Sequence, residues 1–208
     1  DRAATLLWNA ADCSDAAYQV GQAIQIRTAL LERFPDSEHA KDTLHFLAGS
    51  GWLLLQPDGK IIVGGETAGS AQPVVHRYRP DGRLDTGFIP AGNIKPTGYA
   101  TVISDALLLP SGKILLAGTV STAQSPAGYR RNGILLVRLN TNGTLDTSFG
   151  SGGRAIDLFR ETDPADPLLY GYRVDVAAQA DGKLVATGQG GSLRRYRSNG
   201  SLEAVITA

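Results

Sequence analysis

The feature that most constrains this chain is a tandem repeat that fills residues 51 to 208. Its first motif is an apolar run, a tight turn that ends in Gly-Lys, and a second apolar run, and the three copies have their turns at Gly59, Gly112 and Gly182. Repeats of this kind are supersecondary units that bury their apolar faces by stacking on one another. We therefore expect an array of similar units after residue 50.

A second motif alternates with the first and places an Arg before a turn and an acidic residue after it. The turn glycines Gly82, Gly143 and Gly200 are 61 and then 57 residues apart, so one unit spans about 60 residues. Hairpin turns often need a positive φ, which Gly, Asn and Asp tolerate. Each unit is therefore predicted to supply two hairpins, or four strands. The copies of this motif cover residues 76–85, 137–146 and 194–203.

The apolar runs are too continuous for sheets with one solvent-exposed face. They favour propeller blades, whose two faces are both covered by neighbouring blades. We predict a mainly β fold of three four-stranded propeller-type blades, at about 51–103, 104–172 and 173–208. A β-sandwich would explain the strands but not the periodicity. Propellers have four to eight blades. Because three units leave open edges, we expect either a longer chain, in keeping with a start at Asp1 without Met, or a propeller completed by other chains.

Residues 1–50 have a different pattern, with apolar positions at helical spacing. Ala17, Val20, Ile24, Leu31 and Phe34 fall on one helical face, Pro35 interrupts it, and a second helical pattern runs to Gly49. The spacing predicts an α-helical hairpin before the β repeats. Residues 30–48 resemble the tetratricopeptide-type helix pairs of bacterial envelope proteins. A single such pair needs a neighbour to bury its apolar face.

The β repeats also resemble a known family. The run from Gln56 to Lys60 and the run from Arg77 to Phe88 resemble the delta-60 repeat family, bacterial repeats attributed to β-propellers, and Leu145 to Gly150 matches the end of the second copy. The third copy departs from the pattern at 198–199 and 203–204, so its closing strand is the least well defined. The resemblance covers about three quarters of the chain and implies a propeller without an established enzymatic activity.

Composition excludes several classes of function. The 20 Lys and Arg balance the 20 Asp and Glu, so no net field recruits nucleic acid or an anionic membrane. The single Cys13 excludes an intrachain disulfide and a cysteine metal cluster. His39 and His45 lack the spacing of paired ligands, and no apolar stretch is long enough to span a membrane. We expect no metal site, no cofactor, no nucleic acid and no membrane span.

The second motif brings an Arg and an acid together in every unit. Because the pair recurs once per blade, we interpret it as a hydrogen-bonded ion pair that closes the blade, rather than as a ligand site. The predicted blade pairs are Arg77 with Asp85, Arg138 with Asp146, and Arg195 with Glu203.

The copies differ most in two inserts, residues 119–132 and 158–172, which we interpret as variable loops. Variable loops on a repeated scaffold often carry binding specificity, and aromatic residues and Arg are enriched at interface hot spots. The predicted binding residues in these inserts are Tyr129, Arg130, Arg131, Phe159, Tyr170 and Tyr172.

No catalytic constellation occurs: there is no G-x-S-x-G motif, and no His follows residue 76. We therefore predict a non-enzymatic protein–protein interaction or scaffold module of a bacterial envelope or secreted assembly, extracellular or periplasmic. Its partners would be other protein chains or further copies of itself, with carbohydrate as a possible ligand. The alternative is a carbohydrate-binding or lyase-like propeller enzyme with its site at the central channel.

Overall fold

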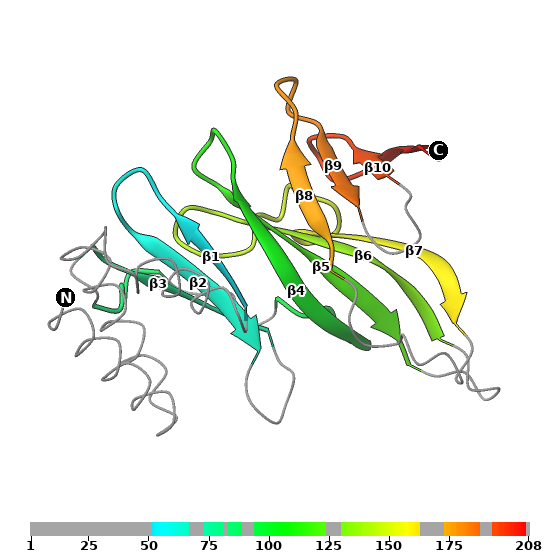
Figure 1. Cartoon of the computed structure of the whole chain (residues 1–208), viewed down its shortest axis with the longest axis horizontal. Helices are drawn as coiled ribbons and strands as arrows, with labels where there is room; N and C mark the ends of the chain where they lie inside the picture. The colour runs from blue at the N-terminus through cyan, green and yellow to red at the C-terminus, as the bar shows by residue number, and fades with distance from the viewer. Residues whose placement is uncertain are drawn as a thin grey trace, which may run out of the picture. The chain divides into compact units, whose positions relative to one another are not determined.

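The structure, a computed structural model, describes residues 51–66, 73–80, 83–88, 94–123, 130–162, 173–187 and 193–206. These residues form eleven strands in three sheets of antiparallel strands, and no sheet among them closes on itself (Figure 1). The prediction of a mainly β fold built from blade-like sheets is confirmed. The helical hairpin predicted for residues 1–50 lies outside the described residues.

The first sheet has three strands in the described residues, one fewer than predicted. The tight turn between its first two strands is closed by two backbone hydrogen bonds, from Gln56 N to Lys60 O and from Gly59 N to Gln56 O. Gly59 has φ +78°, so the turn needs a residue without a Cβ at that point. The strands are β1 (Gly51–Leu55), β2 (Ile61–Glu66) and β3 (Pro73–Tyr78), in the order β1-β2-β3.

The second sheet is the largest and is covered on both faces. Successive residues of a strand point to opposite faces, yet Leu115 and Leu116 are both fully buried, as are Leu135 and Leu136 on the neighbouring strand. This confirms the burial that the continuous apolar runs predicted. The strands are β4 (Tyr99–Leu108), β5 (Ile114–Thr122), β6 (Arg130–Leu139) and β7 (Arg154–Thr162), paired in that order.

The third sheet has shorter strands and lies in the same compact unit as the second, in which β8 packs beside β4 and β5 (Figure 1). Cross-strand pairs such as Arg194 with Ala186 and Tyr196 with Leu184 fix its register. Both pairs lie on the face that packs on the second sheet. The strands are β8 (Asp175–Ala178), β9 (Leu184–Thr187), β10 (Leu193–Tyr196) and β11 (Leu202–Ile206), in the order β8-β9-β10-β11.

A hydrophobic core joins the second and third sheets. Aliphatic side chains of β5 and β6 meet those of β9 and β10, and Phe149 fills the space beside Tyr196. Burial of aliphatic and aromatic side chains is the main favourable contribution to such a contact between sheets, about 1.5–3 kcal/mol for each large side chain. The core consists of Leu115, Ala117, Ile134, Leu136, Phe149, Ala155, Val174, Leu184, Ala186 and Tyr196.

The structure corrects the prediction of a second hairpin in every unit. In the described residues that follow this turn in the first two units, 83–88 and 144–150, one bridge forms in each, Tyr78 with Leu84 and Leu139 with Leu145, and no strand begins. In the second unit the Asp146 carboxylate accepts hydrogen bonds from the N–H and hydroxyl of Ser148, which turns the chain away from the sheet. The fourth strand of the second sheet, β7, therefore forms later in the chain.

The third unit does form the predicted second hairpin, between β10 and β11. Glu203 stands where Asp146 stands in the second unit, and Ala204 replaces Thr147. A glutamate side chain is one methylene too long for the short Asx-type turn. The chain continues as a strand from Leu202 to Ile206 instead.

The predicted inserts are partly strand rather than loop. β5 and β6 stay paired as far as Ser121 with Asn132, and β6 and β7 stay paired from Val137 with Arg154 to Arg130 with Thr162. The copies therefore differ in strand length as well as in loop length. The expected unit boundary at residues 103 and 104 falls within β4.

Candidate interaction surface

The structure brings each predicted Arg–acid pair together. Arg77 Nε donates to Asp85 Oδ2 at 2.9 Å, Arg138 Nε donates to Asp146 Oδ2 at 2.6 Å, and Arg195 Nε donates to Glu203 Oε2 at 2.6 Å. In the second unit a backbone hydrogen bond from Asp146 N to Arg138 O lies beside the pair. Each pair thus ties the end of the third strand of its unit to the residues that follow the turn.

Asp146 accepts hydrogen bonds from two cations and from a serine. Burial opposes its ionisation, but hydrogen bonds from Lys113, Ser148 and Arg138 outweigh that effect and hold the pKa of Asp146 well below its usual range. Glu203 is similar, since Lys183 first and then Arg195 lower its pKa against the effect of burial. A carboxylate held by two cations stays ionised and serves as a structural anchor.

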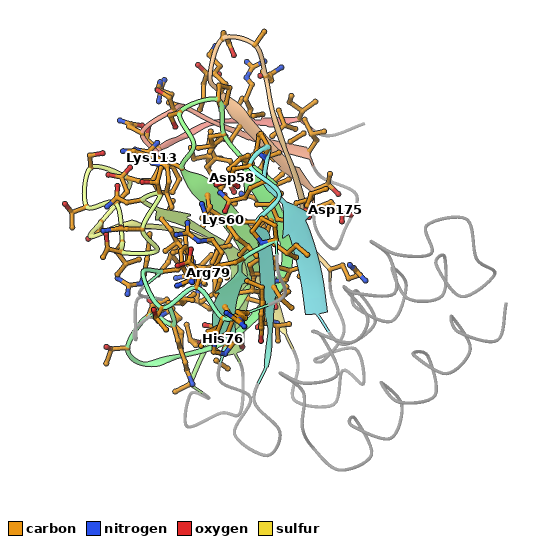
Figure 2. All side chains as sticks on the ribbon, turned by 90° about the vertical axis from the view of Figure 1, so that its left-hand side faces the viewer. Asp58, Lys60, His76, Arg79, Lys113 and Asp175 are labelled. Carbon is orange, nitrogen blue, oxygen red and sulfur yellow. The ribbon has the colours of Figure 1, made fainter. Side chains whose placement is uncertain are left out.

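Sequence reasoning missed the lysine in these clusters, although the signal was present. A Lys follows the turn glycine in all three copies of the first motif, as Lys60, Lys113 and Lys183. Lys113 Nζ donates to Asp146 Oδ2 at 2.7 Å, and Lys183 Nζ lies 3.2 Å from Glu203 Oε1. Lys60 instead pairs with Asp58 in its own turn (Figure 2).

An ionic cluster that the sequence did not reveal joins the second and third sheets. Asp157 on β7 accepts a hydrogen bond from Arg194 NH1 at 2.7 Å and one from the Tyr196 hydroxyl at 3.0 Å, both through Oδ2. Arg194 and Tyr196 lie on β10 and are almost wholly buried. Burial first, and the Asp157 charge second, raise the pKa of Tyr196, which keeps its hydroxyl protonated as a donor.

A second contact between these sheets surrounds Phe149. The Arg138 guanidinium lies 4.6 Å from the centre of the Phe149 ring, and its NH1 donates to Ser198 O of the third unit at 2.6 Å. Gly200 covers the ring so closely that a Cβ there would lie 2.8 Å from Phe149 Cζ. The backbone hydrogen bond from Gly150 N to Asn199 O completes the contact.

A third contact joins the edge strands β4 and β8. Asp105 Oδ2 accepts the Val176 N–H at 2.9 Å, and Ser104 Oγ both accepts from Val174 N at 2.8 Å and donates to Val174 O at 2.9 Å. At this edge the second sheet therefore binds main-chain groups of the third. Main-chain groups carry little sequence information, so such a contact suits any unit with the same backbone.

The opposite face of the third sheet is exposed. Cross-strand partners share a face, and the pairs of Thr187 with Asp175 and with Leu193 place these side chains on the side away from the core. Every member of this face is exposed or half-buried, and Ile206 is 44% exposed. We call the set the exposed face: Asp175, Ala177, Val185, Thr187, Leu193, Arg195 and Ile206.

A hollow of about 790 Å³ lies where β7 meets the turn between β10 and β11. Several of its polar groups already serve the fold: Asp157 and Tyr196 bond to one another, and Asn199 Oδ1 accepts from the N–H and hydroxyl of Ser201. Arg154 donates to the carbonyls of Ile94 and Gly152. The exposed face, with its half-buried aliphatic side chains, is the better candidate for an interaction surface.

The predicted binding residues are only partly described. Arg131 lies exposed on β6, where its N–H donates to Thr122 Oγ1 and its NH2 lies 3.5 Å from Leu158 O. Arg130 and Phe159 belong to β6 and β7, so they lie in strands rather than in loops. Tyr129, Tyr170 and Tyr172 lie outside the described residues, and the binding role of all six stays a prediction.

In the described ranges no group of three His, Cys, Asp or Glu side chains is placed to hold a metal ion. No helix in the same ranges is long and apolar enough to cross a membrane.

Three stretches of the chain match the model of a family described as a β-propeller domain of unknown function, DUF5122. These stretches are similar to propeller-type repeats. The matched residues are 56–88, 109–149 and 179–204, and each stretch includes the turn of the first motif and the Arg–acid pair of the second. The match supports a propeller-like repeat family, in agreement with the three antiparallel sheets.

Two solved structures of the TCP10 domain of Danio rerio CPAP, one a point mutant and one wild type, show weak likeness to this chain. They are 18% and 17% identical to it, and each alignment covers 76% of this chain and 100% of that domain. Both have a TM-score of 0.16, which does not support a common fold. A comparison with the curated proteins finds no match.

Proposed function

We propose that this protein is a non-enzymatic interaction or scaffold module, and that the exposed face of the third sheet is its docking surface. The observation that supports this is a difference between equivalent positions. Leu115 and Leu136 of the second sheet are fully buried against the third sheet, whereas Val185 and Leu193 at the same repeat positions are only half-buried. The repeat thus presents a packing surface that lacks a second layer among the described residues.

The chemistry of the exposed face suits a protein partner. Val185 and Leu193 lie on its two inner strands beside Thr187 and Arg195, and Asp175 and Ala177 lie on the edge strand β8 (Figure 2 labels Asp175). Protein interfaces combine apolar side chains with polar ones, and Arg is enriched in them. The two charges would orient a partner more than they would tighten its binding.

The setting of the module is also a proposal. The resemblance to delta-60 repeats and that of residues 30–48 to tetratricopeptide-type helix pairs support an extracellular or periplasmic role in a bacterial envelope or secreted assembly. In such an assembly the helical pair would serve as a second docking element. Fractionation of the source cells, followed by immunoblotting for the chain, tests this. Recovery in the cytoplasm alone would contradict the proposal.

Site-specific photocrosslinking tests the docking surface. A photoreactive residue at Val185, in the centre of the exposed face, should give a discrete crosslinked product in the source cells, whose components mass spectrometry then identifies. The matched control is the same residue at Val102, which is 42% exposed on β4 of the second sheet. If both positions crosslink to the same mixture, or Val185 to nothing, the exposed face is not a docking surface.

A further inference from the structure

We propose that the exposed face of the third sheet docks the first repeat of a second copy of this chain. This inference rests on the proposed function and names the partner of that surface. It follows from the way the second sheet binds the third, because the third sheet carries the same kind of binding groups and uses none of them on the second.

The exposed face repeats several of the contact groups of the second sheet, although Val174 stands at the position of Ser104. Asp175 stands at the position of Asp105, and Arg195 stands at that of Arg138. Ile206 stands at the position of Phe149, which is wholly buried beneath Gly200. The aliphatic positions are also maintained with smaller side chains: Ala177, Val185 and Leu193 replace Leu107, Leu115 and Leu136.

These groups define what an occupant must offer. Asp105 accepts a strand N–H, and Arg138 NH1 donates to a turn carbonyl, so Asp175 and Arg195 call for the same two main-chain groups. A glycine must also cover the apolar side chain at 206, as Gly200 covers Phe149. A strand end and a Gly turn at this spacing are the features of a propeller-type repeat of this family. The occupant is therefore a repeat rather than an unstructured peptide.

The first repeat of a second copy has the required features in its sequence. Tyr78 stands at the position of Tyr196, and the turn glycine of its second motif, Gly82, stands at that of Gly200. His76 is exposed, although the equivalent positions, Val137 and Arg194, are buried in the other two units. His76 is therefore open at the position where Arg194 meets the second sheet, whereas Tyr78, two residues further on, is buried.

Charge does not oppose a contact between two copies. The chain has no net charge, with 20 basic and 20 acidic side chains, so two copies do not repel each other at long range.

The test is the mass of the purified 208-residue chain, by native mass spectrometry and sedimentation equilibrium. The wild type should be a dimer of about 44 kDa, twice the chain mass of 21.9 kDa. Val185→Glu places an unpaired charge in the interface and should raise the dissociation constant on the order of 100-fold or more. Val102→Glu is the matched control and should remain dimeric. Circular dichroism checks that each variant is folded.

The surface of the second copy is tested separately. His76→Glu changes only the first repeat and should weaken the dimer as Val185→Glu does, because the two residues lie on opposite sides of one contact. A wild-type chain that is monomeric at tens of micromolar overturns the inference, as does a dimer that tolerates either substitution. If the chain is monomeric but Val185 crosslinks to one identified protein, the docking surface stands and only the second copy is refuted.

Discussion

The second and third sheets are built from the same repeat but differ in what surrounds them. The second sheet has strands of nine or ten residues, and adjacent residues such as Leu115 and Leu116 are fully buried on opposite faces. The third sheet has strands of four or five residues and buries one face. The burial of a side chain at a given repeat position therefore depends on the neighbouring layer as well as on its residue type.

The sheets also differ in how their fourth strand begins. In the second, the Asp146 carboxylate caps the N–H of Ser148, and the chain turns so that Phe149 enters the core beneath Gly200. In the third, Glu203 accepts from Arg195 without forming that turn, and β11 follows at once. Ile206 is therefore left exposed at the position where Phe149 is buried.

The largest expected effect comes from one leucine position in the two sheets. Leu136→Ala removes a fully buried side chain and should lower the free energy of unfolding by about 3 kcal/mol. Leu193→Ala, at the same repeat position on the half-buried face, removes less buried apolar surface and should cost about 1 kcal/mol. Urea unfolding followed by circular dichroism at submicromolar protein measures both. Equal losses would mean that the faces of the two sheets are equally covered.

Substitutions at the contact between the second and third sheets should cause the next largest loss of stability. Asp157→Ala removes the carboxylate that accepts from buried Arg194 and Tyr196, and should lower the free energy of unfolding by about 2–3 kcal/mol. Asp175→Ala, on the exposed face, is the control and should cost less than about 0.5 kcal/mol in the monomer. The same unfolding measurement applies. A loss below about 1 kcal/mol for Asp157→Ala would show that this cluster adds little to the stability of the contact between the two sheets.

A pair of turn glycines separates backbone strain from contact. Gly182 and Gly200 have φ of +80° and +88°, so an Ala costs about 1 kcal/mol at either position. Only at Gly200 would the new Cβ also lie 2.8 Å from the Phe149 ring, and overpacking adds about 1 kcal/mol or more. Gly200→Ala should therefore cost about 2 kcal/mol and Gly182→Ala about 1 kcal/mol in the free energy of unfolding. In a Phe149→Leu background the difference between these two losses should become smaller, because the ring that meets the new Cβ is gone.

The sequence predicted the parts of this fold that depend on neighbouring residues. The turn at Gly112, with φ +76°, follows from the Ser-Gly-Lys run, and the Arg138–Asp146 pair follows from its recurrence. These features repeat locally, so they can be identified without knowing where the sheets lie. Lys113 recurs in the same way, so its place beside Asp146 was equally predictable.

The rest of the fold and of the candidate surface depends on contacts between units. Asp157 belongs to no repeat motif, and its partners Arg194 and Tyr196 come from another sheet. The difference between Asp146 and Glu203 is one methylene, yet it decides whether a turn or a strand follows. No periodicity in the sequence encodes such a choice, and the exposed face could be found only once the covered face was known.

The smallest expected difference is in how the stability of the two sheets depends on acidic pH. The pKa of Asp146 is lowered in the folded state, so its contribution to stability is full above its unfolded pKa of about 3.9 and is lost as the pH falls towards the folded value. Asp146→Asn should cost about 1.5 kcal/mol at pH 7 and progressively less below about pH 5. Glu203→Gln should show the same direction with a smaller loss, because Glu203 lies at the more exposed end of the third sheet. Urea unfolding between pH 7 and pH 3 measures both. If the loss for Asp146→Asn stayed constant with pH, the charge of its carboxylate would not anchor the second sheet. Asp146 and Glu203 would then differ only in how deeply they are buried.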